Sequence, residues 1–429
     1  MSISTTTGAP ERGVAAARSA RDVRHNAIAL GADFALFLVG LAFASQSTIL
    51  PAFAAHLGAP YVVIGAIPAI MTLGWCLPSL FAAGHTESLT ARLPFVLRYT
   101  VWERIPFVVL ALLAFFVARP APAVALAGLL AMLLVMTGAG GVLMPAWMDI
   151  VGRAIPTGLR GRFFGLANVL GSAGGLAGSV GTAYLLARVP PPASYGVCFL
   201  CASVCMALSY VALGTVREPG GVVASPRVSM RTYLRRIPGL LARDDNLVWY
   251  LIARACWSVG MMAGGFYTVY ALRVWHAPDW WVGTFTSVFL AGQIAGNLAL
   301  GPLADRAGHR LVIITGVAAG AAASILAPSA PSLGVFAAVF ALSGVQSAAI
   351  NVSGLNVLLE FAPSVDERPT YVGLGTTLLA PLMFAAPIAA GVMADHLGFL
   401  PVFAASAVGG SASLVLLMRR VRDPRHGQE

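Results

Sequence analysis

The sequence predicts an all-α integral membrane protein whose twelve transmembrane helices form two pseudo-symmetric six-helix bundles. Three observations predict this fold: twelve long apolar runs, arginines gathered on one side of those runs, and short motifs shared by the two halves. Of the 429 residues, 58% are hydrophobic and only 10% are charged. A run of about 20 apolar residues crosses the hydrocarbon core as a helix, which satisfies its own backbone hydrogen bonds there.

The apolar runs place the spans at 28–50, 61–83, 103–118, 121–148, 163–187, 194–215, 246–272, 280–302, 310–328, 332–358, 370–393 and 399–418. The third span has the weakest signal, since a short apolar stretch follows Glu103 and Arg104. An even number of crossings puts both chain ends on the same side of the membrane.

The basic residues set the orientation. All 27 of them are Arg, and all but four fall in the tails and loops on the side of the two termini. The exceptions are Arg119, Arg188 and Arg273 on the other side and Arg254 inside a span. The positive-inside rule therefore predicts a multi-pass protein of the bacterial cytoplasmic membrane with both termini in the cytoplasm. The formal charge of +10 then indicates anionic lipid of the inner leaflet, and not nucleic acid, as a partner.

The chain divides into five parts. Residues 1–27 are a polar cytoplasmic tail without the apolar core of a signal peptide. Two bundles at 28–215 and 246–420 flank a cytoplasmic linker at 216–245, and a short tail covers 421–429. In the linker, Leu234, Ile237 and Leu241 share one helical face, which predicts an amphipathic helix on the inner leaflet. We expect a monomer.

The halves share an internal repeat. The pattern R-x-x-x-x-G-L begins at Arg160 and again at Arg368. A second set of matches relates Gly65 to Gly283, Glu87 to Asp305, and Arg92 to Arg310. These matches predict parallel halves related by an axis along the membrane normal.

The loop after the eighth span reads Gly301-Pro-Leu-Ala-Asp305-Arg306-Ala-Gly308-His309-Arg310. It resembles the signature loop of the major facilitator superfamily, G-x-x-x-D-R-x-G-R-R, and the likeness extends over about residues 28–420. The resemblance implies a secondary transporter of unassigned substrate whose cytoplasmic gate is latched by this loop. The gating residues would be Gly301, Asp305, Arg306, Gly308 and Arg310, with Glu87, Arg92, Arg160 and Arg368. The alternative is that the loop only anchors a turn.

Two charges lie well inside predicted spans, where a charge at mid-bilayer costs about 2.5–3.5 kcal/mol. They are Asp33 in the first span and Arg254 in the seventh. In the family that the chain resembles, these spans line the central cavity. We therefore hypothesise that the two side chains face the cavity and pair across it, with Asp33 carrying a coupling proton and Arg254 holding an anionic group. The alternative is that both lie near the interface, with Arg254 reaching the headgroups.

Further polar or aromatic side chains lie at lipid depth. Candidates for contact with a small-molecule substrate are Trp257, Gln293, Asn297, Gln346 and Asn351. The alternative role of such amides is hydrogen bonding between neighbouring helices.

The sequence contains no phosphate-binding loop, no metal-ligand spacing and no catalytic arrangement, so we expect no enzyme activity, cofactor or metal. The prediction is a secondary active transporter that moves a small organic molecule by alternating access, coupled to an ion or to protons. Aromatic and amide candidates favour efflux of an amphipathic compound. One alternative is a permease for uptake of a nutrient or organic anion, and another is a non-transporting membrane sensor or scaffold on the same fold.

Overall fold

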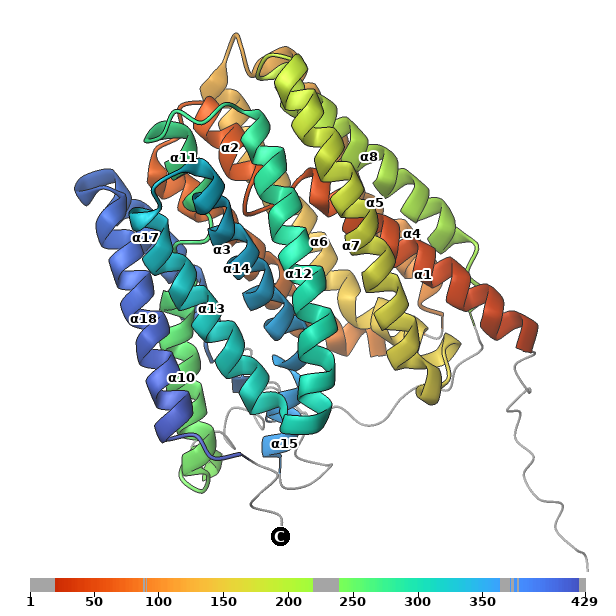
Figure 1. The fold of residues 1–429 in the computed structure, drawn as a ribbon. Coiled ribbons are helices and arrows are strands. Elements are labelled where there is room, and N and C mark those ends of the chain that lie inside the picture. Colours follow the sequence, from red (N-terminus) through yellow and green to blue (C-terminus); the bar gives the residue numbers. More distant parts are fainter. Residues whose placement is uncertain are drawn as a thin grey trace, which may run out of the picture.

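The computed structural model describes residues 20–87, 89, 91–218, 239–362, 371, 374–375 and 378–423. Across these residues the chain forms helices and no strands, and eleven helices are long and apolar enough to cross a membrane. A twelfth crossing is made of two shorter helices in series. The predicted all-α membrane fold is confirmed, and Figure 1 shows the helices running side by side from end to end of the molecule.

The first bundle contains α1 (Ala20–Phe43), α2 (Ile49–His56), α3 (Tyr61–Glu87), α4 (Leu93–Tyr99), α5 (Val101–Leu112), α6 (Pro122–Ala154), α7 (Thr157–Arg188) and α8 (Ala193–Gly214), with a π-helical turn at Leu113–Val117. Helix α1 begins within the segment that we predicted to be tail. The third crossing starts at Leu93, ten residues before the predicted 103, because α4 and α5 continue one another. Glu103 and Arg104 therefore lie inside this crossing and not in a loop before it.

The second bundle contains α10 (Asp245–Gly260), α11 (Tyr267–Arg273), α12 (Trp280–Ala307), α13 (His309–Ser329), α14 (Leu333–Ser353), α15 (Asn356–Phe361), α17 (Ala380–Leu397) and α18 (Phe399–Arg419). The predicted span 246–272 is thus two helices joined by a turn. Most of the predicted amphipathic helix of the linker lies outside the described residues. Within its described end, Leu240 and Leu241 pack against the apolar core of this bundle.

The two bundles repeat one arrangement. The first crossing of each half is interrupted by a turn, at residues 44–48 between α1 and α2 and at 261–266 between α10 and α11. Helix α3 packs on α6 as α12 packs on α14, and α1 packs on α8 as α10 packs on α18. These equivalent packings fit the parallel repeat that the sequence motifs predict.

The main contacts between the bundles are made by two pairs of helices, α3 with α17 and α7 with α12, and α2 adds smaller contacts with α11 and α12. The tight contacts of both pairs, at Gly65 of α3 and Gly283 of α12, lie near the starts of these helices, at the end of the molecule that holds α2 and α11, away from the C-terminus (Figure 1). At Gly65 of α3 a Cβ would collide with the carbonyl of Pro387, and at Gly283 of α12 it would collide with the backbone of Ala183. Glycine is required at these two positions because backbone packs directly against backbone.

Replacing Gly283 with Leu should separate α7 from α12 at this end. Overpacking at a tight contact costs about 1–3 kcal/mol, which should shift the protein away from the closed arrangement. The measurement is the rate at which a membrane-impermeant maleimide labels Ser179→Cys, a buried α7 position, with the five native cysteines replaced by alanine. Gly181→Leu is the matched control, since a Cβ at Gly181 meets nothing within 4 Å. Equal labelling in both variants would contradict the assignment of Gly283 to a close contact between α7 and α12.

Candidate functional site

The largest site between the bundles is a cavity of about 540 Å³. Helices α1, α3 and α7 of the first bundle and α12 and α14 of the second contribute its walls. Its polar lining consists of Ser45, Gln46, Ser47, Thr72, Asn168, Ser172, Thr286, Gln293, Asn297, Ser347 and Asn351. Aromatic rings of Phe34, Trp75 and Phe289 complete the wall. No charged side chain is among the described residues that line it.

A smaller cavity of about 280 Å³ continues from this one along α7 and α12. The two share Asn168, Ser172, Asn297 and Asn351, and the smaller one extends to Gly165 near the start of α7. That direction leads to the end of the molecule where the described chain finishes, at Asp423. The central cavity therefore continues towards the terminal end.

At the other end, polar contacts join the bundles. The hydroxyls of Thr48 and Thr286 lie 2.6 Å apart, and those of Ser179 and Ser287 lie 2.7 Å apart. Thr268 Oγ1 donates to the carbonyl of Ser47 at 2.9 Å. Each pair has one member in each bundle, so together they close the cavity at the end near α2 and α11.

Charged side chains complete the same closure. His56 Nε2 lies 2.6 Å from Asp279 Oδ1. Arg273 donates to the carbonyl of Ala59 at 2.8 Å, and its guanidinium carbon lies 4.7 Å from the centre of the Tyr61 ring. The carboxylate of Asp395 accepts the N–H groups of Tyr61 and Val62 at 2.8 and 2.9 Å, which caps the first turn of α3 from the other bundle.

The predicted cavity residues separate into two groups. Gln293, Asn297 and Asn351 lie together in the cavity wall, where Gln293 Nε2 donates to Ser347 Oγ at 3.0 Å. Gln346 is 9% exposed and packs on Gly320 of α13, and Trp257 is 3% exposed in the apolar core of the second bundle. Their predicted contact with substrate has no support from these positions.

Sequence reasoning missed Asn168 and Gln46 as members of the wall. Asn168 lies in the glycine-rich fifth crossing, where it is the only carboxamide of α7. An isolated carboxamide among mainly small and apolar residues in the middle of this helix was the available signal.

A second pocket, of about 280 Å³, lies inside the first bundle. It shares Phe34 and Trp75 with the central cavity, so these two aromatic side chains form the wall between them. Its other lining is mostly apolar, with three charged groups: Asp33, Glu103 and Arg104. All three are buried, with exposures of 3%, 7% and 8%.

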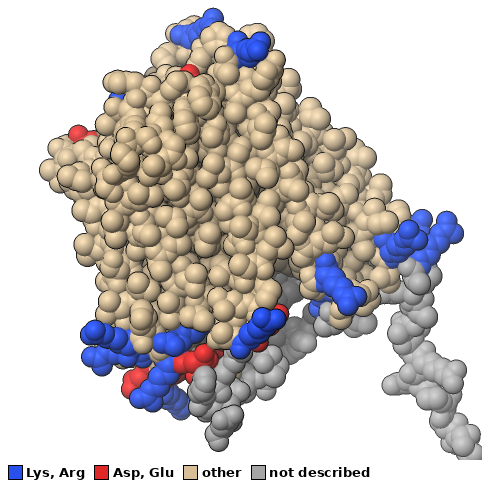
Figure 2. Space-filling view, viewed as in Figure 1, with Lys and Arg blue, Asp and Glu red and all other residues tan. Residues whose placement is uncertain are grey.

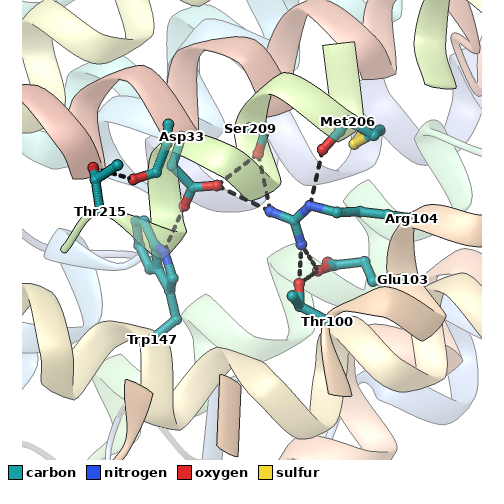
Figure 3. Close-up of polar contacts among 9 residues, drawn as sticks. Asp33, Thr100, Glu103, Arg104, Trp147, Met206, Ser209 and Thr215 are labelled. Carbon is teal, nitrogen blue, oxygen red and sulfur yellow. Dashed lines mark hydrogen bonds and ion pairs between the residues drawn. The ribbon is translucent and has the colours of Figure 1, made fainter. Parts of the chain in front are cut away.

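Asp33 lies at the centre of the hydrogen bonds in this pocket (Figure 3). Its Oδ1 accepts from Arg104 Nη2 at 2.9 Å and from Ser209 Oγ at 2.6 Å. Its Oδ2 accepts from Trp147 Nε1 at 3.0 Å. Helices α1, α5, α6 and α8 are thereby joined at one carboxylate.

Arg104 is held from several directions. Its Nε donates to the carbonyl of Met206 at 3.2 Å, and Nη2 donates also to Ser209 Oγ at 2.9 Å. Its Nη1 contacts the hydroxyl of Thr100 and lies 3.4 Å from Glu103 Oε2. A guanidinium with this many partners inside the membrane is fixed in place, since each lost hydrogen bond would leave a buried donor unsatisfied.

The hypothesis that Asp33 pairs with Arg254 is wrong, because the partner of Asp33 is Arg104. Arg254 instead donates from Nη1 to the carbonyl of Gly354 at 3.2 Å, within the second bundle. Gly354 lies at the interruption between α14 and α15, where a carbonyl is free of its usual helical partner. This contact gives Arg254 a role in holding that interruption.

The predicted gating residues lie at the terminal end. Asp305 and Arg306 are exposed at the end of α12, and a Cβ at Gly301 would meet open space. Gly308 joins α12 to α13 with φ +94°, which favours glycine. Arg310 donates to the carbonyl of Leu417 at 2.8 Å.

The copy in the first bundle also makes contacts within its own bundle. Arg92 pairs with Asp149 at 2.9 Å, and its backbone N–H donates to Glu218 at 2.7 Å. Arg160 donates to the carbonyls of Ile155 and Gly152. The side chain of Glu87 and all of Arg368 lie outside the described residues. The hydrogen bonds between the bundles described above lie at the opposite, closed end.

Comparison with known proteins agrees with this arrangement. The family model described as Major Facilitator Superfamily matches residues 276–429. A crystal structure of the nucleoside transporter NupG (D323A mutant) superposes with a TM-score of 0.65 at 15% identity, covering 92% of this chain and 98% of that one. This chain has the major facilitator superfamily fold. The resemblance suggested by the 301–310 loop is thus confirmed at the level of the fold.

Other solved structures share the major facilitator fold with this chain. The D-xylose-proton symporter gives a TM-score of 0.64 at 15% identity, covering 93% of this chain and 98% of that one. A bacterial homologue of the human lysosomal transporter Spinster, in an inward-facing and unoccupied conformation, gives 0.62 at 14% identity, covering 93% and 95%. No curated protein matches the sequence.

Replacing Arg104 with Met should destabilise the protein more than replacing Asp33 with Asn. Without Arg104, the buried carboxylate of Asp33 loses its counter-charge, whereas in Asp33→Asn the amide oxygen can still accept from the guanidinium, which also has Glu103 beside it. Removing one partner of a buried pair costs about 3–5 kcal/mol. The melting temperature in detergent measures the effect, with Arg98→Met, at an exposed arginine of the same crossing, as the control. Equal losses for Arg104→Met and Arg98→Met would contradict a buried ion pair.

Proposed function

We propose that this protein is a secondary active transporter that moves a small, uncharged organic molecule through the cavity between its bundles by alternating access. The observation that carries the proposal is the cavity itself. It continues towards the terminal end and is closed at the other end by hydrogen bonds between the bundles. In major facilitators the two halves rock about a central site of this kind.

The chemistry of the wall favours an uncharged cargo. Amides and hydroxyls provide hydrogen-bond donors and acceptors, and aromatic rings provide apolar surface, but the described lining contains no charge. A cargo with polar groups and an apolar face fits such a wall. Two of the similar structures are named as a nucleoside transporter and a D-xylose-proton symporter, which supports this class of cargo.

The alternatives gain less from the geometry. Uptake of an organic anion by means of Arg254 loses support because Arg254 binds a backbone carbonyl away from the cavity lining. A sensor or scaffold would not require a polar cavity between the bundles that is closed at one end by hydrogen bonds. Export of an amphipathic compound stays our prediction, and uptake of a neutral nutrient is the other outcome of the transport assay.

The distribution of charge supports the orientation. Figure 2 shows a broad belt without Lys, Arg, Asp or Glu between two charged rims, with most of the visible arginines on the rim near the C-terminal end. By the positive-inside rule that rim faces the cytoplasm of a bacterial inner membrane. The cavity in this arrangement would then extend towards the cytoplasmic side.

The test begins with purified protein and a set of compounds comprising nucleosides, pentoses and hexoses, dipeptides and amphipathic amines. A ligand that raises the melting temperature is then used, in radiolabelled form, for counterflow in proteoliposomes. We expect counterflow with at least one of the uncharged compounds in this set. Absence of counterflow with every stabilising compound would favour the sensor or scaffold.

Asn351→Ala and Gln293→Ala should each weaken binding of that ligand by about fivefold, because one hydrogen bond contributes roughly 1 kcal/mol and a factor of ten corresponds to about 1.4 kcal/mol. Asn356→Ala is the control, since Asn356 is exposed and donates only to the carbonyl of Val352, four residues before it. Ligand affinity is measured from counterflow or from the shift in melting temperature. Wild-type affinity in both cavity variants would place the binding site elsewhere.

A further inference from the structure

The pocket inside the first bundle contains more acidic than basic side chains. Asp33 and Glu103 are two buried carboxylates, and Arg104 is the one guanidinium between them. The helices packed around the pocket add Trp75 from α3, Trp147 from α6 and Ser209 from α8, which are uncharged. With both acids ionised, the site would hold one excess negative charge inside the membrane.

The contacts of Asp33 favour its ionised form. Both carboxylate oxygens accept hydrogen bonds, and the donors are Arg104, Ser209 and Trp147. An arginine and an indole N–H can only donate, so a proton on Asp33 would displace one of them. Asp33 and Arg104 thus form a neutral, well-bonded pair.

Glu103 has a different environment. Its Oε2 accepts from the hydroxyl of Thr100 at 3.1 Å, and the contact with Arg104 Nη1 is long, at 3.4 Å. Its Oε1 extends towards α6, where a Cβ on Gly140 would lie 2.7 Å from it, beside the ring of Trp75. Among the described residues, no hydrogen bond to Oε1 accompanies this position, and the side chain lines the pocket. A buried carboxylate that lacks a full set of partners is neutralised by binding a proton.

We propose that Glu103 is a proton-binding site. In the arrangement described here, its carboxylate takes one proton from water, becomes a neutral carboxylic acid, and removes the excess charge of the pocket. The acid O–H at Oε1 then faces the pocket, and the proton leaves to water through this pocket. Asp33, which the sequence suggested as the proton carrier, acts instead as the fixed counter-ion of Arg104.

The site is adjacent to the proposed path of the cargo. Phe34 and Trp75 belong to the walls of both cavities, and the ring of Trp75 lies beside the same glycine as Glu103 Oε1. Gain or loss of the proton therefore changes the charge directly behind the wall of the central cavity. This coupling of proton to cargo rests on the proposed transport function, whereas proton binding itself does not.

Infrared difference spectroscopy of the protein in lipid, recorded while the pH is stepped from acid to alkaline, tests the binding without any cargo. We expect one carbonyl stretch of a neutral carboxylic acid at neutral pH, shifted by ¹³C labelling of glutamate and not by labelling of aspartate. Glu103→Gln should abolish it, and Glu360→Gln, a glutamate near the end of α15, should retain it. A band that follows the aspartate label, or that survives in Glu103→Gln, would overturn the proposal.

A second measurement gives the consequence for transport. With the ligand found by counterflow, Glu103→Gln should keep exchange at equal pH on both sides but lose accumulation driven by a pH gradient. Gradient-driven accumulation at the wild-type level would overturn the coupling of this proton to the cargo. If the infrared band is lost in Glu103→Gln but the wild type shows no counterflow, the transport function is rejected and the proton site is retained.

Discussion

The ion pair between Asp33 and Arg104 is the interaction on which the first bundle depends. A charge in the membrane interior is tolerated only when it is paired and hydrogen-bonded. Here one carboxylate and one guanidinium neutralise each other, and their hydrogen bonds join four helices. The pair also explains the third crossing, whose sequence is the least convincing as a membrane span. Its residues Thr100, Glu103 and Arg104 are buried against the other helices of the bundle and not exposed to lipid.

The two bundles use their charges differently. The first contains a cluster of acids and a guanidinium in a pocket that adjoins the central cavity. The second has Arg254, which is occupied by a backbone carbonyl at an interrupted helix. The cavity between them is uncharged. Recognition of the cargo and handling of charge are thus separated in space, with Phe34 and Trp75 between them.

The fold was predictable because hydropathy and the arginine distribution report on lipid and on topology, which depend on composition. The wall residues Gln293 and Asn297 were found because two amides four residues apart lie on one helical face. Trp257 and Gln346 were predicted to line the cavity, but both are buried within the second bundle. Helices in a membrane bundle are apolar on every side, so the sequence does not distinguish the face towards the cavity from the face towards a neighbouring helix. Arg104 was taken for a loop residue, since a window of hydropathy does not reveal that α4 and α5 form one crossing with Asp33 across from it.

Gly65 and Gly283, matched by the internal repeat, occupy equivalent places in the two contacts between the bundles. One contact lies on each flank of the cavity, so the two glycines together define an axis about which one bundle can rotate relative to the other. With a glycine on both flanks, the two bundles can separate evenly. A bulkier residue on one flank would hold the bundles apart there and not on the other flank, which would add a twist to the rotation. Natural variation at these two positions should therefore occur jointly, with any loss of a glycine on one flank answered on the other.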